Sequence, residues 1–209
     1  MVKNDDMSFP EFRAGFFKLV QNIIKHCAAG LFSLEGSRFE TIVLTVIFAM
    51  QHEKPELMEL GLVSMQALNH ILSENPHNAS IFYQNFYSRI LKETMVVITD
   101  YRHMSGFKYQ GLILQQLLQA VDRNDVIQGN IILNDPNGQP HQFGSNKQFV
   151  QEYLVALLLE QFPNLNKVQV EGFILKLFNS VYEWTQFKGN LRDLLISMKS
   201  FAHTDDAFY

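Results

Sequence analysis

Hydrophobic residues recur at every third or fourth position along nearly the whole chain, a pattern that is typical of amphipathic α-helices. The clearest example is QFVQEYLVALLLEQFPNL, residues 148–165, where Val, Leu, Phe and Tyr outnumber Gln, Glu and Asn. Polar or proline-containing segments interrupt the pattern at intervals. These breaks predict eight helices, which begin near residues 8, 37, 55, 76, 105, 145, 166 and 185.

Several of the predicted helices begin with residues that can cap a helix N-terminus. Ser8 and Glu11 match a capping box, in which two side chains satisfy backbone N–H groups of the first turn. Pro10 suits that turn because it has no N–H group to leave unbonded. Similar capping signals are Ser145 with Gln148, Asn166 with Gln169, Thr185, and the Ser105-Gly106 pair that opens the fifth helix.

The first and last predicted helices differ in their outer surfaces. The first helix has one apolar face and further phenylalanines beside it, so we expect part of its apolar surface to be exposed in this chain. The face consists of Phe12, Phe16, Leu19, Val20, Ile23 and Cys27. The last helix combines a narrower stripe with a polar outer side that can cap the end of a helical array. The stripe is Phe187, Leu191, Leu194 or Leu195, Met198 and Phe201, and the outer side holds Lys188, Arg192, Asp193 and Lys199.

Short connections place successive helices antiparallel, so the eight helices form about four pairs. Each pair takes about 45 to 50 residues, which is the period of HEAT and armadillo repeats. We therefore predict an all-α fold, an α-solenoid of about four antiparallel helix pairs with right-handed superhelical stacking. The predicted domain covers residues 8–203, with pairs at about 8–52, 55–100, 105–163 and 166–203. Residues 1–7 are expected to be a disordered or added tail, and residues 204–209 the start of a truncated one.

One connection is much longer than the others. Residues 123–144, RNDVIQGNIILNDPNGQPHQFG, contain three Gly and two Pro residues, and Asp135-Pro136-Asn137-Gly138 is a strong turn signal. A short hairpin around that turn fits the pattern. The segment is either a functional loop or a simple surface excursion.

Composition narrows the class of protein. Among 209 residues, 47% are hydrophobic, the net charge is −4, and there is one cysteine. No cluster of Lys or Arg indicates a nucleic-acid or anionic-membrane surface. The longest apolar run, residues 42–50, is about half of what a bilayer requires. A single cysteine excludes an intrachain disulfide, so we expect an intracellular soluble protein.

Residues that could support catalysis or metal binding are scattered. No two of the seven histidines have a ligand spacing with a further His or Cys. Asp100 and His103 lie three positions apart, and we interpret Asp100 as a helix cap and not as half of an acid–base pair. The segment from Asp122 begins like a calcium loop but has Ile127 where the turn requires Gly. We predict an inert thiol at Cys27 and no catalytic, cofactor or metal site, and we assign no partner-binding residues.

Five blocks in order resemble the C-terminal end of the exportin-1 family, the nuclear export receptors of the importin-β superfamily. They are FPEFRAGFFKLVQ, FYQNFYSRILKE, VVITDYRHMSG, QFVQEYLVALLLEQFPNL and FKGNLRDLLISMKSFAHTDD, which together span residues 9–206. The resemblance implies a HEAT-repeat receptor that is not an enzyme. It also implies that the full-length parent binds Ran-GTP, cargo with a leucine-rich export signal, and nucleoporins, and shuttles between nucleus and cytoplasm through the nuclear pore.

The chain also departs from that family. Full exportins are several times longer, and the repeats that hold the cargo groove with its reactive cysteine are missing here. Cys27 does not match that cysteine. We therefore expect a fragment that is monomeric, binds Ran-GTP weakly or not at all, and pairs in crystals through its exposed first helix. The alternative is an unrelated HEAT- or armadillo-like scaffold that binds peptides or protein partners in a groove.

Overall fold

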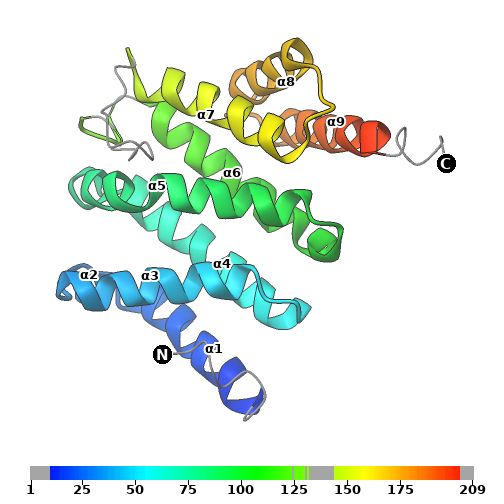
Figure 1. Cartoon of the computed structure of the whole chain (residues 1–209). Coiled ribbons are helices and arrows are strands. Elements are labelled where there is room, and N and C mark those ends of the chain that lie inside the picture. Colours follow the sequence, from blue (N-terminus) through cyan, green and yellow to red (C-terminus); the bar gives the residue numbers. More distant parts are fainter. Residues whose placement is uncertain (1–9, 124, 130, 132–143, 203–209) are drawn as a thin grey trace. The chain divides into compact units, whose positions relative to one another are not determined.

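The computed structural model describes residues 10–123, 125–129, 131 and 144–202, and within these it consists of helices and loops without a strand. The predicted all-α class is therefore confirmed (Figure 1). The helices are α1 (Pro10–His26), α2 (Ala28–Phe32), α3 (Gly36–Met50), α4 (Pro55–Ser73), α5 (Pro76–Thr99), the 3₁₀ helix η1 (Tyr101–Gly106), α6 (Phe107–Asp122), α7 (Asn146–Gln161), α8 (Lys167–Asn179) and α9 (Trp184–Ala202).

Most predicted helices begin within about two residues of the observed ones. Two short elements, α2 and η1, are additions that periodicity did not predict. Thr185 was wrong as a cap, because α9 begins at Trp184 and Thr185 already lies in its first turn. Ser105-Gly106 was also wrong as a helix start, because both residues belong to η1. Ser8 and the turn at residues 135–138 lie outside the described residues.

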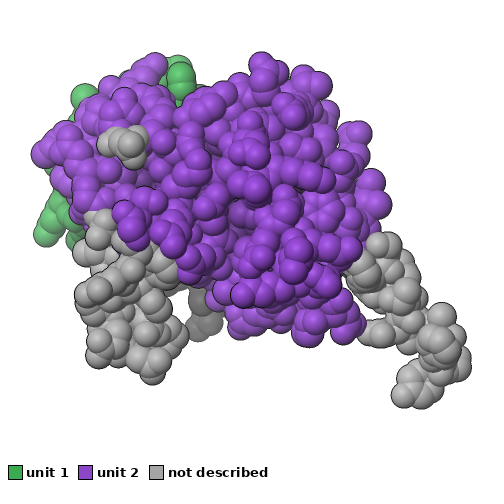
Figure 2. Space-filling model, turned by 90° about the horizontal axis from the view of Figure 1, so that it is seen from above, with its two compact units in different colours: residues 1–72, 96–113 green, residues 73–95, 114–209 purple. Residues whose placement is uncertain are grey.

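The chain forms two compact units, which Figure 2 distinguishes by colour. Unit 1 comprises residues 1–72 and 96–113, and unit 2 comprises residues 73–95 and 114–209. Helices α5 and α6 each contribute one part to either unit. The right-handed superhelical stacking stays a prediction.

The core of unit 1 forms where α1 packs on α2 and α3. Phe17, Ala49 and Leu57 form a buried cluster, with Phe48 and Leu60 packed against it. Part of the apolar surface of α1 is exposed, as the sequence predicted: Phe12 is 68% exposed and Leu19 is 56% exposed. Unit 1 therefore exposes part of the apolar surface of α1.

The connection from α5 to α6 is held tightly inside unit 1. Asp100 caps η1 by accepting a hydrogen bond from the backbone N–H of Arg102 at 2.9 Å. Gly106 allows a close approach, because a Cβ atom there would lie 2.6 Å from Cδ1 of Leu62. Asp100 thus caps the 3₁₀ turn, and Gly106 leaves room for the Leu62 side chain where the turn ends.

The core of unit 2 contains large aromatic side chains of α5. Phe82, Tyr83 and Tyr87 are fully buried, and the Tyr87 hydroxyl donates a hydrogen bond to the carbonyl oxygen of Leu117 on α6 at 2.9 Å. Helix α8 packs on both α7 and α9. The stripe predicted for the last helix is confirmed by the burial of Phe187, Leu191, Leu194 and Met198; Phe201 lies among residues whose side chains are not described. No helix in the described part is both long and apolar enough to cross a membrane.

Candidate functional site: a groove between α7 and α8

The candidate site lies between two antiparallel helices of unit 2, α7 and α8. Helix α7 begins where the Ser145 hydroxyl accepts a hydrogen bond from the Gln148 N–H at 3.2 Å. Helix α8 begins where the Asn166 side chain accepts one from the Val168 N–H at 2.9 Å. Both caps were predicted from the sequence. The short connection over residues 162–166 brings α8 back along α7 and leaves a groove between them.

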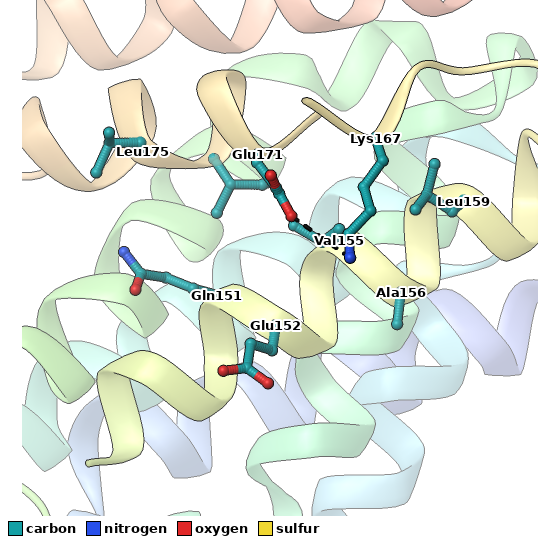
Figure 3. A pocket seen from close by; sticks show the side chains of 9 residues that line it. Gln151, Glu152, Val155, Ala156, Leu159, Lys167, Glu171 and Leu175 are labelled. Carbon is teal, nitrogen blue, oxygen red and sulfur yellow. Dashed lines mark ion pairs between the residues drawn. The ribbon is translucent and has the colours of Figure 1, made fainter. Parts of the chain in front are cut away.

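The groove encloses about 700 Å³ and has an apolar centre (Figure 3). Val155 and Ile174 form its buried base, whereas Ala156, Leu159 and Leu175 face the opening. Leu175 is 54% exposed. Gln151, Glu152, Lys167 and Glu171 complete the lining.

The charged residues of the groove are weakly paired. Lys167 and Glu171 form an ion pair at 3.7 Å, one turn apart on α8 (Figure 3), and both side chains are largely exposed. Such pairs contribute little to stability. Glu152 accepts a hydrogen bond from Gln148 at 3.0 Å, which leaves its charge in place. The lining therefore contains two carboxylates and one ammonium group.

A polar network in unit 2 connects α6, α7 and the turn before α9. The Asp122 carboxylate accepts hydrogen bonds from Lys147 Nζ at 2.7 Å and from the Tyr182 hydroxyl at 2.8 Å. Partial burial tends to raise the pKa of Asp122, but these two hydrogen bonds outweigh it and the pKa lies below its usual value. Partial burial and the bond to Asp122 raise the pKa of Tyr182 to about 12.

A second set of hydrogen bonds holds the turn before α9. The side-chain amides of Gln115 and Gln119 on α6 both donate to the carbonyl oxygen of Val181, at 2.9 and 2.8 Å. Two donors on one carbonyl, together with the Asp122 network, fix the turn from which α9 starts. Because α9 packs on α8, this anchoring also supports one wall of the groove.

The groove has a lining of mainly aliphatic and amide side chains with three charged groups. Its lining combines aliphatic side chains with Gln, Glu and Lys, and it contains no Ser, Cys or His that could serve as a nucleophile or a nearby base. Among the described residues, no group of His, Cys, Asp or Glu side chains is arranged to hold a metal ion. The apolar base and exposed aliphatic residues of the groove have the chemistry that apolar side chains of a ligand would contact.

A family model described as CRM1 C terminal matches residues 1–203 of the chain. The chain belongs to this CRM1 C-terminal family. It is 30% identical over its whole length to exportin-1 of Schizosaccharomyces pombe, where the match covers 19% of the relative. It is 31% identical over 99% of its length to Protein EXPORTIN 1B of Arabidopsis thaliana, covering 19% of that protein, and 27% identical over 99% of its length to exportin-1 of Drosophila melanogaster, covering 18%. The chain thus spans about a fifth of the length of these relatives.

The family resemblance expected from the five sequence blocks is therefore confirmed as a C-terminal region of exportin-1 type. The Asp100–His103 pair of this CRM1 C-terminal chain has the structural role that the sequence indicated. Asp100 caps η1 and forms an ion pair with Arg102 at 2.8 Å. His103 is buried, with Nε2 3.2 Å from the carbonyl oxygen of Gln51 and Nδ1 3.2 Å from Oδ2 of Asp100. The pair thus connects η1 to the end of α3 inside unit 1.

The expected position of Cys27 was wrong. The sequence placed it on the apolar face of the first helix, but α1 ends at His26 and Cys27 is exposed at the junction with α2. Cys27 is the N-cap residue of α2, and Leu31, four residues later, is buried. The inertness of the thiol stays a prediction.

The groove itself was missed by sequence reasoning. The available signal was the sequence of α7, in which apolar residues surround most of the helix circumference. The structure leaves Ala156 exposed and Leu159 half-buried on the groove side. The sequence could therefore have indicated the site through the apolar residues of α7 that exceed those needed on its buried face.

Proposed function

We propose that this CRM1 C-terminal chain is the terminal interaction module of a nuclear export receptor. In this proposal the full-length receptor carries cargo with a leucine-rich export signal, together with Ran-GTP, past the nucleoporins of the nuclear pore, and shuttles between nucleus and cytoplasm. The module acts by binding and positioning and performs no catalysis. The family match over residues 1–203 carries the proposal, and the relatives named exportin-1 support the transport role.

We further propose that residues 8–203 form a HEAT-repeat domain, with helix pairs at about 8–52, 55–100, 105–163 and 166–203. The exposed α1 face supports continuation of the array. Phe12, Phe16 and Leu19 form an apolar surface that a preceding helix pair of a longer receptor can cover. In isolation the chain is expected to be a monomer at low concentration that pairs through this face when concentrated.

The transport role can be tested with a chimera. The corresponding C-terminal region of the S. pombe exportin-1 is replaced by residues 1–203, and nuclear export of a reporter with a leucine-rich signal is measured in cells that depend on the chimera. We expect export to be restored. A chimera that is folded and abundant but exports nothing contradicts the proposal.

The limited role of the isolated module is tested separately. The chain is titrated with Ran loaded with GTP or GDP, and we expect weak binding or none. A tight complex that depends on GTP contradicts the proposal that Ran recognition needs the rest of the receptor. For the α1 face, Phe12→Asp is expected to abolish concentration-dependent pairing in solution scattering. A wild-type chain that stays monomeric at high concentration contradicts the pairing.

A further inference from the structure

We propose that the groove between α7 and α8 binds a short amphipathic helix of a partner protein, one that has basic residues beside its apolar stripe. The inference rests on the proposed function, because it assigns a partner to the same interaction module. The observations that carry it are the shape of the groove, the exposure of its apolar residues and the excess of carboxylates in its lining.

The shape of the groove matches a helix of about two turns. The residues of the α7 wall, from Gln151 to Leu159, and those of the α8 wall, from Lys167 to Leu175, each recur at steps of about one helical turn. Each wall covers nine residues, and at 1.5 Å of rise per residue it is about 12 Å long. Rows of side chains spaced in this way form the ridges and grooves into which a third helix packs.

The backbone requirement also favours a helix over an extended segment. The backbone N–H and C=O groups of α7 and α8 are bonded within their own helices, so the walls offer only side chains. An extended peptide would bury part of its backbone against Val155 and Ile174 without partners for its polar groups. A helix satisfies its own backbone and presents only side chains to this apolar base.

The charges favour a basic partner. Glu152 and Glu171 lie in the lining with Lys167, which is already engaged by Glu171 at 3.7 Å. In Figure 3 the Glu152 carboxylate lies apart from the Lys167–Glu171 ion pair. A Lys or Arg of the docked helix placed beside its apolar stripe therefore meets a carboxylate, whereas an acidic residue meets a like charge.

The test uses the complete chain and synthetic helical peptides of about 14 residues with leucines at i, i+4 and i+7. One peptide has lysines beside the leucines, a second has glutamates there, and a third repeats the lysine sequence with a central proline that breaks the helix. Binding is measured by fluorescence anisotropy. We expect saturable binding of the lysine peptide, at least about tenfold tighter than the glutamate peptide and lost in the proline peptide.

Three variants locate the binding. Leu175→Asn, which removes the aliphatic side chain without adding charge, is expected to weaken binding of the lysine peptide at least about tenfold. Glu152→Lys is expected to reverse the preference towards the glutamate peptide. The control is Ile196→Asn on α9, which alters a residue that is similarly exposed, at 58%, but lies outside the groove, and should leave binding unchanged. Circular dichroism checks that each variant is folded.

Clear results would overturn the inference. Equal loss of affinity in the Leu175 and Ile196 variants would mean that the peptide does not bind in the groove. Equal affinity for the lysine and proline peptides would indicate an extended ligand instead. If no peptide binds while the chimera still exports its reporter, the groove inference fails and the proposed function stands; if peptides bind and a folded chimera does not export, the reverse holds.

Discussion

Replacing Gly61 with alanine should destabilise unit 1, even though alanine generally favours helices. Gly61 lies in α4, and a Cβ atom there would contact the backbone N of Met50 and lie 2.6 Å from the carbonyl carbon of Ala49. These are backbone atoms near the end of α3, so rotation of a side chain cannot relieve the contact. Overpacking of this kind costs about 1–3 kcal/mol, and the immovable neighbours place Gly61 near the upper value. The helix preference of alanine offsets about 1 kcal/mol, which leaves a net loss of about 2 kcal/mol.

The assay is thermal and urea unfolding followed by circular dichroism. A loss of about 2 kcal/mol corresponds to a decrease in the melting temperature of roughly 4–8 °C for a chain of this size. The matched control is Gly15→Ala, which lies in α1 of the same unit and whose Cβ would meet nothing within 4 Å. It should gain up to about 1 kcal/mol. If both variants are stabilised, the close approach of α4 to α3 is refuted.

Three further predictions concern buried polar groups. The hydrogen bond from the Arg102 side chain, despite partial burial, lowers the pKa of Asp100 from 3.8 to about 2, so the stability from the ionised Asp100 is present above about pH 4 and lost as pH falls towards 2. Asp100→Asn should lower the free energy of unfolding by about 1 kcal/mol at neutral pH, a small value because Arg102 is largely exposed to solvent. In urea unfolding, the difference between this variant and the wild type should shrink below pH 4. Burial raises the pKa of Tyr87 well above its usual value of 10, so the stability from the neutral Tyr87 is present below pH 10 and lost above it. Tyr87→Phe should lower the free energy of unfolding by about 1 kcal/mol at neutral pH. In urea unfolding at alkaline pH, the stability of this variant should decline less steeply than that of the wild type. The Thr94 hydroxyl is buried without a hydrogen-bond partner among the described residues, so Thr94→Val should raise the free energy of unfolding by about 1 kcal/mol and increase the melting temperature. The control Thr41→Val, at an exposed helical position, should change the melting temperature little.

The helices could be predicted from the sequence because their signals are local. Capping residues such as Ser145 and Asn166 act on N–H groups two or three positions away, and the structure has both hydrogen bonds. The apolar stripe of the last helix is also a local pattern. The sequence left Leu194 and Leu195 as alternatives, and packing decides between them: Leu194 is buried, whereas Leu195 is half-buried.

The features that could not be predicted depend on contacts between segments distant in the chain. The turn at η1 requires the close approach of Gly106 to Leu62, more than forty positions earlier. The position of Cys27 depends on where the chain leaves α1 to bury Leu31. The groove also depends on contacts between helices. Ile174 and Leu175 are neighbouring aliphatic residues, and the packing of α8 on α7 and α9 buries Ile174 at the base of the groove and leaves Leu175 exposed at its rim.

Helix α7 connects the fold to the proposed binding surface. Its core side consists of Val150, Leu154 and Leu158, which are fully buried and would suffice to hold the helix in unit 2. On its other side, Ala156 is exposed and Leu159 is half-buried, and both line the same groove as the exposed Leu175 of α8. Both α7 and α8 have apolar residues on the groove side, and the single Lys167 does not neutralise both Glu152 and Glu171. A basic amphipathic helix is the ligand that accounts for the aliphatic and the charged residues together.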